Sequence, residues 1–468
     1  MKAPTTRVRD IRALALGLTL SAAAFPMMSA AVQADDRRPG MFDGWYVDGE
    51  WVMSKQKQPT ATDLADFGGG RLMGRMLYRL DPVFVGGGYH TGLLTNELGV
   101  VQFDGNRGRF FVFGQLNVAF IDIDNENPAS DNSYLATNWA GPTHLGVGAE
   151  YELNKEWAVG GRLSFALAFN RTDINNDFAD DAGCDERDAE RRKFCVYDAN
   201  LYLTSRYGTL TGGYLETAFS GIGGINLGGT GHVTNNDPTI KVGFHEAWGT
   251  GREFGFIAPE VTGVTRAAGL RYDSPSFAGF VFSASFGDAE HVGAPFDAED
   301  YWDVAIRYAG EFGGFRVAAG VGYQEYDRDV PGWEQSNVTV SGSLFHVPTG
   351  LYVSPSFSGL TRDAPTAPSG VETDDADAYY VQFGIRQIWL DFGNTTLYGE
   401  FGGSDSSADN GDYFRRASDT SNFGLGVVQD IDRAAMALYL SYNNVEADFA
   451  GSSAEDIDVI MGGARVKF

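Results

Sequence analysis

Long apolar segments are almost absent from this sequence of 468 residues. Its hydrophobic share is 43% and its mean hydropathy is −0.20, values that exclude a protein crossing a membrane with several apolar helices. The one apolar run, Ala13–Leu20, follows four basic residues and leads into small residues ending at Ala34. This pattern predicts a signal peptide at residues 1–34, cleaved before Asp35 on export. The alternative, an uncleaved anchor helix, is disfavoured because the apolar core is short and is interrupted by Pro26.

Basic residues are also scarce, with 35 lysines and arginines against 62 acidic residues. Without residues 1–34, which carry four basic groups and one acidic group, 31 basic and 61 acidic groups remain and the net charge is −30. A chain this acidic does not suit binding to nucleic acid or adhesion to anionic lipid. If the protein selects among ions, its charge leads us to expect cations.

Cysteine occurs twice, at Cys184 and Cys195, within one charged segment. In an oxidising compartment we expect the two to form a disulfide, which stabilises a short loop by roughly 3 kcal/mol. The alternative is two unrelated free thiols. No second Cys/His pair accompanies them, so a zinc site is not expected.

Motifs of catalysis are missing too. The sequence has no G-x-S-x-G, no phosphate-binding G-x-x-x-x-G-K-[ST], and six scattered histidines. The stretch Asp122–Glu126 offers clustered oxygen ligands for calcium, but a solvated acidic loop is favoured because the twelve-residue spacing of a calcium loop is absent. We therefore expect no enzyme, no metal site and no cofactor, calcium at this loop being the one candidate.

What the sequence does contain is alternation with a period of two. It is clearest at residues 157–169, 301–309 and 336–344, where apolar side chains alternate with small or polar ones. In a β-strand this gives one apolar and one polar face. A soluble β-sandwich would alternate as well, so the alternation alone does not identify the fold.

Three further features favour a membrane barrel. Aromatic residues gather near segment ends, short connectors such as Tyr207–Gly208 and Pro348–Gly350 alternate with longer polar ones, and residues 108–468 divide into an even number of strands, as a closed barrel needs. We predict an all-β protein, a transmembrane antiparallel β-barrel with polar residues inside, spanning residues 108–468. Its sixteen strands are expected at residues 108–122, 142–153, 157–170, 196–206, 209–217, 263–274, 279–288, 300–312, 315–327, 335–347, 351–362, 376–389, 394–404, 420–430, 434–448 and 455–468.

Residues 35–107 lie outside this pattern and form an N-terminal extension. Trp45–Met53 and Leu98–Phe103 are candidate strands within it. Three interpretations stay open: a periplasmic segment, a plug in the lumen, or two extra strands that make an eighteen-stranded barrel.

Several stretches resemble the general trimeric porin family of Gram-negative bacteria. They are Phe113–Val118 (FGQLNV), Ser205–Tyr214 (SRYGTLTGGY), Gly269–Ser285 (GLRYDSPSFAGFVFSAS) and the final GARVKF. The resemblance covers residues 108–468 and implies a homotrimer in the outer membrane, in contact with lipid and lipopolysaccharide. It also implies that Phe468 belongs to the signal read by the barrel-assembly machinery.

The resemblance further implies a third loop folded into the lumen as a constriction. The longest connector, about residues 218–262, is glycine-rich at first and then charged; the alternative is an external lid. The charged residues expected at the constriction are Asp237, Lys241, Glu246, Arg252, Glu253 and Glu260.

Opposite such a loop, the family places arginines on the wall. By parity the lumen-facing candidates are Arg162, Arg206, Arg271, Arg307 and Arg386. Gln115 and His144 stand where relatives often carry basic residues, so the basic wall is expected to be weaker. The alternative for each arginine is a lumen residue paired with a nearby carboxylate.

The function expected from these features is a water-filled channel for passive diffusion of ions and small hydrophilic solutes. Two alternatives remain: a channel specific for a sugar or an anion, restricted by residues 35–107, and a structural or adhesive barrel with a closed lumen.

Overall fold

The structure is a computed structural model, and the chain divides into two compact units, Met1–Met41 and Phe42–Phe468. All residues that the structure describes lie in the second unit. They are residues 44–47, 50–53, 101–104, 108–125, 133–154, 156–169, 172, 194–234, 246–247, 252–253, 263–288, 298–328, 332–366, 370–406, 419–449, 452–453 and 456–467.

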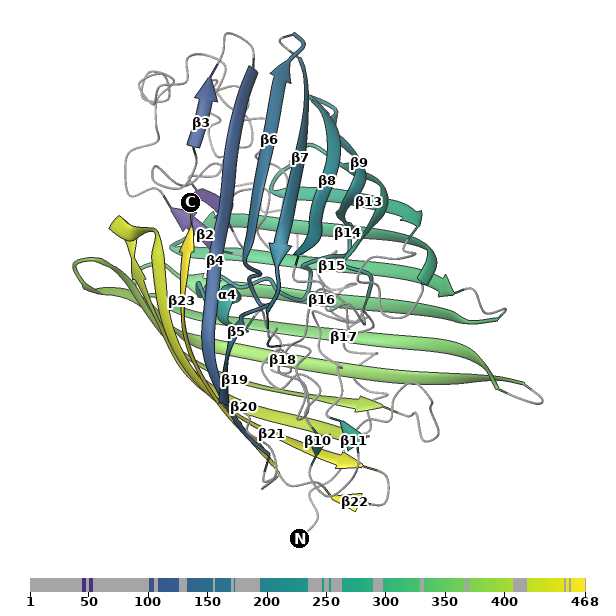
Figure 1. Cartoon of the computed structure of the whole chain (residues 1–468), viewed down its shortest axis with the longest axis vertical. Helices are drawn as coiled ribbons and strands as arrows, with labels where there is room; N and C mark the ends of the chain where they lie inside the picture. The colour runs from purple at the N-terminus through teal and green to yellow at the C-terminus, as the bar shows by residue number, and fades with distance from the viewer. Residues whose placement is uncertain are drawn as a thin grey trace. The chain divides into compact units, whose positions relative to one another are not determined.

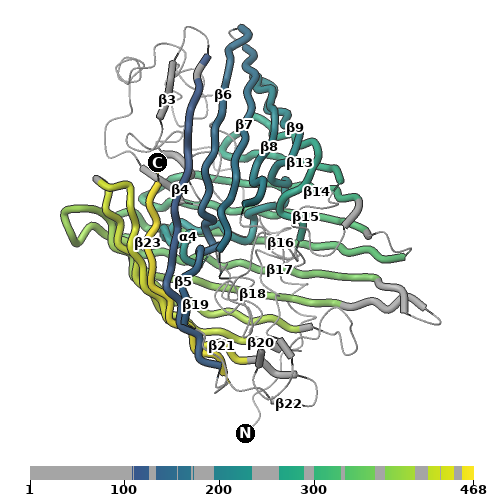
Figure 2. The backbone as a smooth tube through the Cα atoms, in the orientation of Figure 1, coloured from purple at the N-terminus to yellow at the C-terminus, as the bar shows by residue number. Residues whose placement is uncertain are grey.

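The second unit is built on a closed antiparallel barrel, in which each wall strand pairs with its neighbours in chain order and the last strand pairs with the first (Figure 1). The sixteen wall strands are β4 (Gly108–Asp124), β6 (His144–Glu152), β7 (Trp157–Leu167), β8 (Phe194–Ser205), β9 (Gly208–Glu216), β12 (Arg266–Asp273), β13 (Phe280–Asp288), β14 (Ala298–Phe312), β15 (Phe315–Arg328), β16 (Glu334–His346), β17 (Leu351–Thr366), β18 (Gly370–Leu390), β19 (Gly393–Ser406), β20 (Asp419–Ile431), β21 (Met436–Phe449) and β23 (Ile457–Lys467). Each overlaps one predicted segment, so the predicted sixteen-stranded barrel is confirmed. Figure 2 follows the same path along the backbone.

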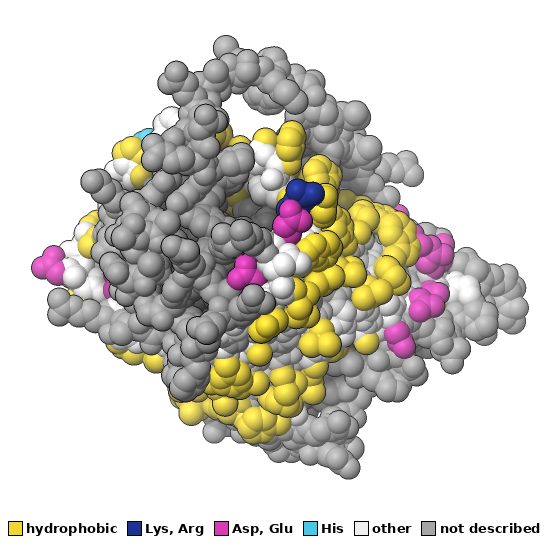
Figure 3. All heavy atoms as spheres, turned by 90° about the horizontal axis from the view of Figure 1, so that it is seen from above, with side chains coloured by type: hydrophobic (Ala, Val, Ile, Leu, Met, Phe, Trp, Pro, Cys, Tyr) yellow, Lys and Arg dark blue, Asp and Glu magenta, His cyan; other side chains and the backbone are white. Residues whose placement is uncertain are grey.

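The apolar side chains of the period-two pattern face outward, as predicted for a barrel in lipid. Along β13, Phe280, Phe282 and Phe286 are exposed, while Ser283 and Ser285 between them are buried. Large apolar side chains are exposed along the other wall strands as well, and Figure 3 shows hydrophobic side chains over the flank of the barrel. A wall that is apolar outside and polar inside suits a sheet that spans lipid around an aqueous lumen.

The second wall strand is interrupted. β5 (Ser133–Thr137) pairs with residues 118–122 of β4, β6 pairs with residues 108–115, and residues 138–143 leave the ladder between them. The backbone of these residues is bound by Asn117, whose Nδ2 donates to the carbonyl of Gly141 at 3.0 Å. The predicted strand at residues 142–153 corresponds to β6 alone, and β5 was not predicted.

One edge of β4 pairs with two different strands, one that precedes β4 in the chain and one from the C-terminal end. β23 pairs with residues 115–124 of β4, and β3 (Val101–Asp104) pairs with residues 109–112. Phe468 lies outside the described residues, so its role in assembly stays a prediction. The domain boundaries at residues 34 and 107 also stay predictions.

Connectors at one end of the barrel are short. Residues 206–207 alone join β8 to β9, residues 313–314 join β14 to β15, and residues 391–392 join β18 to β19.

The remaining short elements are β1 (Gly44–Val47), β2 (Glu50–Met53), α4 (Gly231–Thr234), β10 (Glu246–Ala247), β11 (Arg252–Glu253), the 3₁₀ turn Asp432–Ala434 and β22 (Ser452–Ser453). Within the described part of the chain, no helix is long and apolar enough to cross a membrane.

Candidate pore constriction

After β9 the chain turns into the barrel, and residues 217–234, here named the inner loop, are buried there. Wall strands far apart in sequence bind it. Ser343 Oγ on β16 accepts from the Leu227 amide at 3.0 Å, and Thr396 Oγ1 on β19 donates to the Gly228 carbonyl at 2.9 Å. The predicted folding of the long connector into the lumen is therefore confirmed for residues 217–234.

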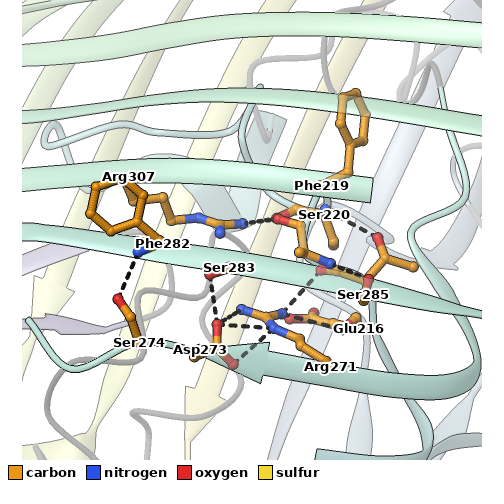
Figure 4. A network of polar contacts seen from close by, with 12 residues as sticks. Glu216, Phe219, Ser220, Arg271, Asp273, Ser274, Phe282, Ser283, Ser285 and Arg307 are labelled. Atoms are coloured by element: carbon orange, nitrogen blue, oxygen red, sulfur yellow. Dashed lines mark hydrogen bonds and ion pairs between the residues drawn. The ribbon is translucent and has the colours of Figure 1, made fainter. Parts of the chain in front are cut away.

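The root of the inner loop rests on a cluster of charged side chains from β12 and β14 and of serines from β13 (Figure 4). Arg271 pairs with Asp273 at 2.7 Å, and its Nη1 donates to the carbonyls of Glu216 and Thr217 at 3.2 and 3.0 Å. Ser283 Oγ donates to Asp273 at 2.7 Å. These side chains meet because alternate residues of neighbouring strands share the inner face.

Asp303 and Arg307, four residues apart on β14, complete this cluster. Asp303 accepts from the amides of Ala218 and Phe219 at 3.2 and 3.0 Å. Arg307 Nη2 donates to the carbonyls of Ala218 and Ser220, both at 2.7 Å. The charges thus hold the first residues of the loop through its backbone.

Beyond the root, the loop packs on a seam of small residues in β15. An added Cβ at Gly320 would meet Ile225 and Ile222 at 2.7 and 3.0 Å, and one at Gly322 would meet Phe219 at 2.9 Å. Sequence reasoning missed this seam. Its signal was the alternation of small residues at 318, 320 and 322, which places no large side chain on the inner face.

The far end of the inner loop is held by β4, β18 and β21. Asn117 Nδ2 donates to the His232 carbonyl at 3.0 Å, and the Tyr439 hydroxyl donates to Asn117 Oδ1 at 2.8 Å. Thr234 and Tyr380 share a hydroxyl hydrogen bond at 3.1 Å, and the Tyr380 hydroxyl reaches Glu400 at 2.5 Å. The inner loop is therefore attached to the inner wall at residues 218–220 and again at residues 232–234.

Most of the predicted wall residues face the interior. Gln115, His144, Arg162, Arg271 and Arg307 are buried, and the side chain of Arg386 is 13% exposed. His144 stacks on Tyr197 with ring centroids 5.4 Å apart, and Gln115 donates to the Pro142 carbonyl at 3.0 Å. Arg386 pairs with Asp430 at 3.1 Å. Arg266, which was not predicted, pairs with Glu216 at 2.5 Å.

The prediction that Arg206 faces the lumen was wrong. It lies in the turn between β8 and β9, where its side chain is 62% exposed and pairs with Glu156 at 3.6 Å. Arg206 also lies against the Tyr207 ring at 4.7 Å. The parity prediction failed because β8 ends at Ser205, one residue too early for Arg206 to take a place on the inner face.

The predicted constriction charges fall outside the part of the chain that the structure describes in full. Asp237, Lys241 and Glu260 lie beyond the described residues, and Glu246, Arg252 and Glu253 are described only as the paired strands β10 and β11. Cys184 also lies outside, whereas Cys195 is on β8, so the disulfide stays a prediction. In the described part of the chain, no group of three acidic, histidine or cysteine side chains is placed to hold a metal.

A closed barrel that is apolar outside, polar inside and narrowed by an attached loop defines the class of transmembrane channels. Comparison with known protein families leads to the same class. The family model described as "Gram-negative porin" matches residues 104–450, and the chain belongs to that family. It is an outer-membrane channel for passive diffusion of solutes. No curated protein matches the chain.

A solved porin shares its fold, and two other outer-membrane proteins were also matched. The anion-selective porin from Comamonas acidovorans is 14% identical with a TM-score of 0.53, covering 77% of this chain and 100% of its own. A loop L8 deletion mutant of OmpT, an outer membrane protein of Vibrio cholerae, is 15% identical (TM-score 0.49; 78% and 100%). The outer membrane channel DcaP of Acinetobacter baumannii is 14% identical (TM-score 0.49; 78% and 99%). At 14% identity, the likeness to the Comamonas porin concerns the fold alone.

Proposed function

We propose that this porin passes ions and small hydrophilic solutes through a lumen narrowed by the inner loop, without binding one solute specifically. The observation that carries the proposal is the attachment of this loop to the inner wall at its root and at its far end. A segment held at residues 218–220 and at residues 232–234 sets a fixed limit on solute size, and the polar wall around it stays wet.

We further propose a homotrimer that is exported through a cleaved signal peptide and inserted by the barrel-assembly machinery into lipid and lipopolysaccharide. The resemblance of residues 108–468 to trimeric porins supports this assembly. We assign the protein no catalytic role, because the side chains described at the constriction bind the loop and one another.

Single-channel recording of the purified protein in a planar bilayer tests the proposal. We expect large ohmic steps that no single sugar or anion blocks. Steps blocked at low concentration by one solute would support the specific channel, and a silent bilayer would support a structural barrel.

The same recordings assess the remaining predictions. Deleting residues 35–107 should raise the conductance if this extension is a plug and leave it unchanged if the segment is periplasmic. The reversal potential in a salt gradient reports the ion preference, for which the net charge of −30 leads us to expect cations.

A further inference from the structure

We propose that Asp303 and Arg307 set the size limit of the pore by positioning the inner loop, and that they do not set its ion preference. This inference rests on the proposed channel function. It differs from the expectation that the wall arginines act on passing ions through their charge.

The first argument is where the hydrogen bonds go. Both oxygens of Asp303 accept loop amides, from Ala218 at 3.2 Å and from Phe219 at 3.0 Å, and Gln324 Nε2 donates to one of them at 3.1 Å. Ser285 Oγ also donates to Asp303. A carboxylate that accepts several such bonds is held firmly, and it holds its donors in turn.

Arg307 supplies the opposite half of this attachment. Its Nη2 donates to the Ala218 and Ser220 carbonyls, so Ala218 is bound through both its amide and its carbonyl. The two side chains together bind three consecutive residues of the loop, just where it leaves the wall. They therefore determine the direction in which the loop enters the lumen.

The second argument is burial. Asp303 and Arg307 are each 1% exposed, so the residues around them separate their charges from a solute in the lumen. Phe219 and Ile222 pack on Gly322 of the neighbouring strand. Phe219 is one of the three residues bound through their backbone, and Ile222 lies two residues after the last of them. Releasing the backbone would therefore release this packing as well.

The third argument is charge balance. The charged side chains that bind the loop root, or pair with one another beside it, are three arginines and three carboxylates. They are Arg266, Arg271, Arg307, Glu216, Asp273 and Asp303. Arg266 and Glu216 pair at 2.5 Å, and Arg271 and Asp273 pair at 2.7 Å. Charges of opposite sign this close largely cancel at the distance of a passing ion, and salt weakens the remainder.

Two single variants with opposite charge changes test the inference. Asp303→Asn removes a negative charge and turns an amide group toward the loop N–H groups, whereas Arg307→Met removes a positive charge and the donors to Ala218 and Ser220. We expect both to enlarge the exclusion limit for graded polyethylene glycols and to raise the unit conductance about 1.5-fold or more, because the constriction controls passage. We expect neither to shift the reversal potential by more than the controls do.

The controls are Glu156→Gln and Arg206→Met, which make the same kinds of charge change in exposed turns. If the two test variants shift the reversal potential in opposite directions and leave the exclusion limit unchanged, the charges act on ions and the inference is wrong. Unchanged size limit and unchanged potential would overturn it as well.

Folding is checked by the heat-dependent gel mobility of each variant. If Arg307→Met fails to fold, Asp303→Asn still tests the inference, because it keeps the size of the side chain. A silent wild-type protein would instead refute the proposed channel function, and the two failures are therefore distinguishable.

Discussion

At the scale of single residues, the interior is organised by polar side chains that each serve several partners. Asn117 is fully buried, donates to the carbonyls of Gly141 and His232, and accepts from the Tyr439 hydroxyl. It thereby joins the interruption of the second wall strand to the far end of the inner loop. One amide side chain connects three segments that are distant in sequence.

Replacing Asn117 with alanine should destabilise the protein by about 1–3 kcal/mol, because buried polar groups lose their partners. We also expect noisier open-channel current, since the far end of the loop is less firmly held. The unfolding midpoint in urea and the current variance measure the two effects. Asn444→Ala, which removes a bond to Asp458 near the surface, is the matched control. Equal stability of the two variants would contradict the role of Asn117.

At the scale of elements, β15 makes room for the inner loop because part of its inner face carries no large side chains. Gly320 and Gly322 leave space that Phe219, Ile222 and Ile225 fill. The neighbouring Ala305 on β14 belongs to the same buried apolar group as Ile222. Apolar packing of this kind adds to the polar attachment, because each buried side chain removes apolar surface from water.

Gly322→Leu should displace the inner loop without unfolding the barrel. Its Cβ alone would meet Phe219 at 2.9 Å and Ile222 at 3.2 Å, so the loop must move. We expect a smaller exclusion limit for polyethylene glycols in liposome swelling, because the leucine pushes the loop away from the wall and further into the lumen. Gly462→Leu on β23 is the control, since a Cβ there meets nothing closer than 3.5 Å. The same exclusion limit for both variants would show that the seam does not hold the loop.

At the scale of the whole barrel, the outer face determines stability in lipid. Leu425 in the middle of β20 is 51% exposed and lies among other exposed apolar residues such as Phe423. A side chain at such a position contacts lipid chains in the membrane. Replacing it with another apolar residue should leave the barrel stable, whereas replacing it with a charged residue should destabilise the barrel.

Leu425→Arg should lower the stability of the folded barrel in vesicles by about 2–4 kcal/mol, the cost of arginine near the middle of the bilayer. Urea titration in phospholipid vesicles measures the change. Phe277→Arg is the control, because Phe277 is 78% exposed in the turn between β12 and β13, beyond the ends of both strands. A cost as large for Phe277→Arg would mean that position in the band does not matter.

Much of the fold could be predicted from the sequence, because strand periodicity and turn residues are local. The segments at residues 301–309 and 336–344 alternate within themselves, and both are wall strands in the structure. β5 was missed because it has five residues and is separated from β6 by residues 138–143, whose path depends on Asn117 and His232. Contacts between distant segments leave no local pattern.

The sequence by itself determined the barrel and its two faces, whereas sixteen strands were favoured over eighteen and the resemblance to porins implied the inward folding of the longest loop. Only the tertiary structure decided what the interior charges bind. Parity placed Arg271 and Arg307 inside, but not beneath the loop backbone, and it misplaced Arg206 by the one residue at which β8 ends. The reason is physical: the face that a side chain occupies is set by its own strand, whereas its partner is set by the closure of the whole sheet.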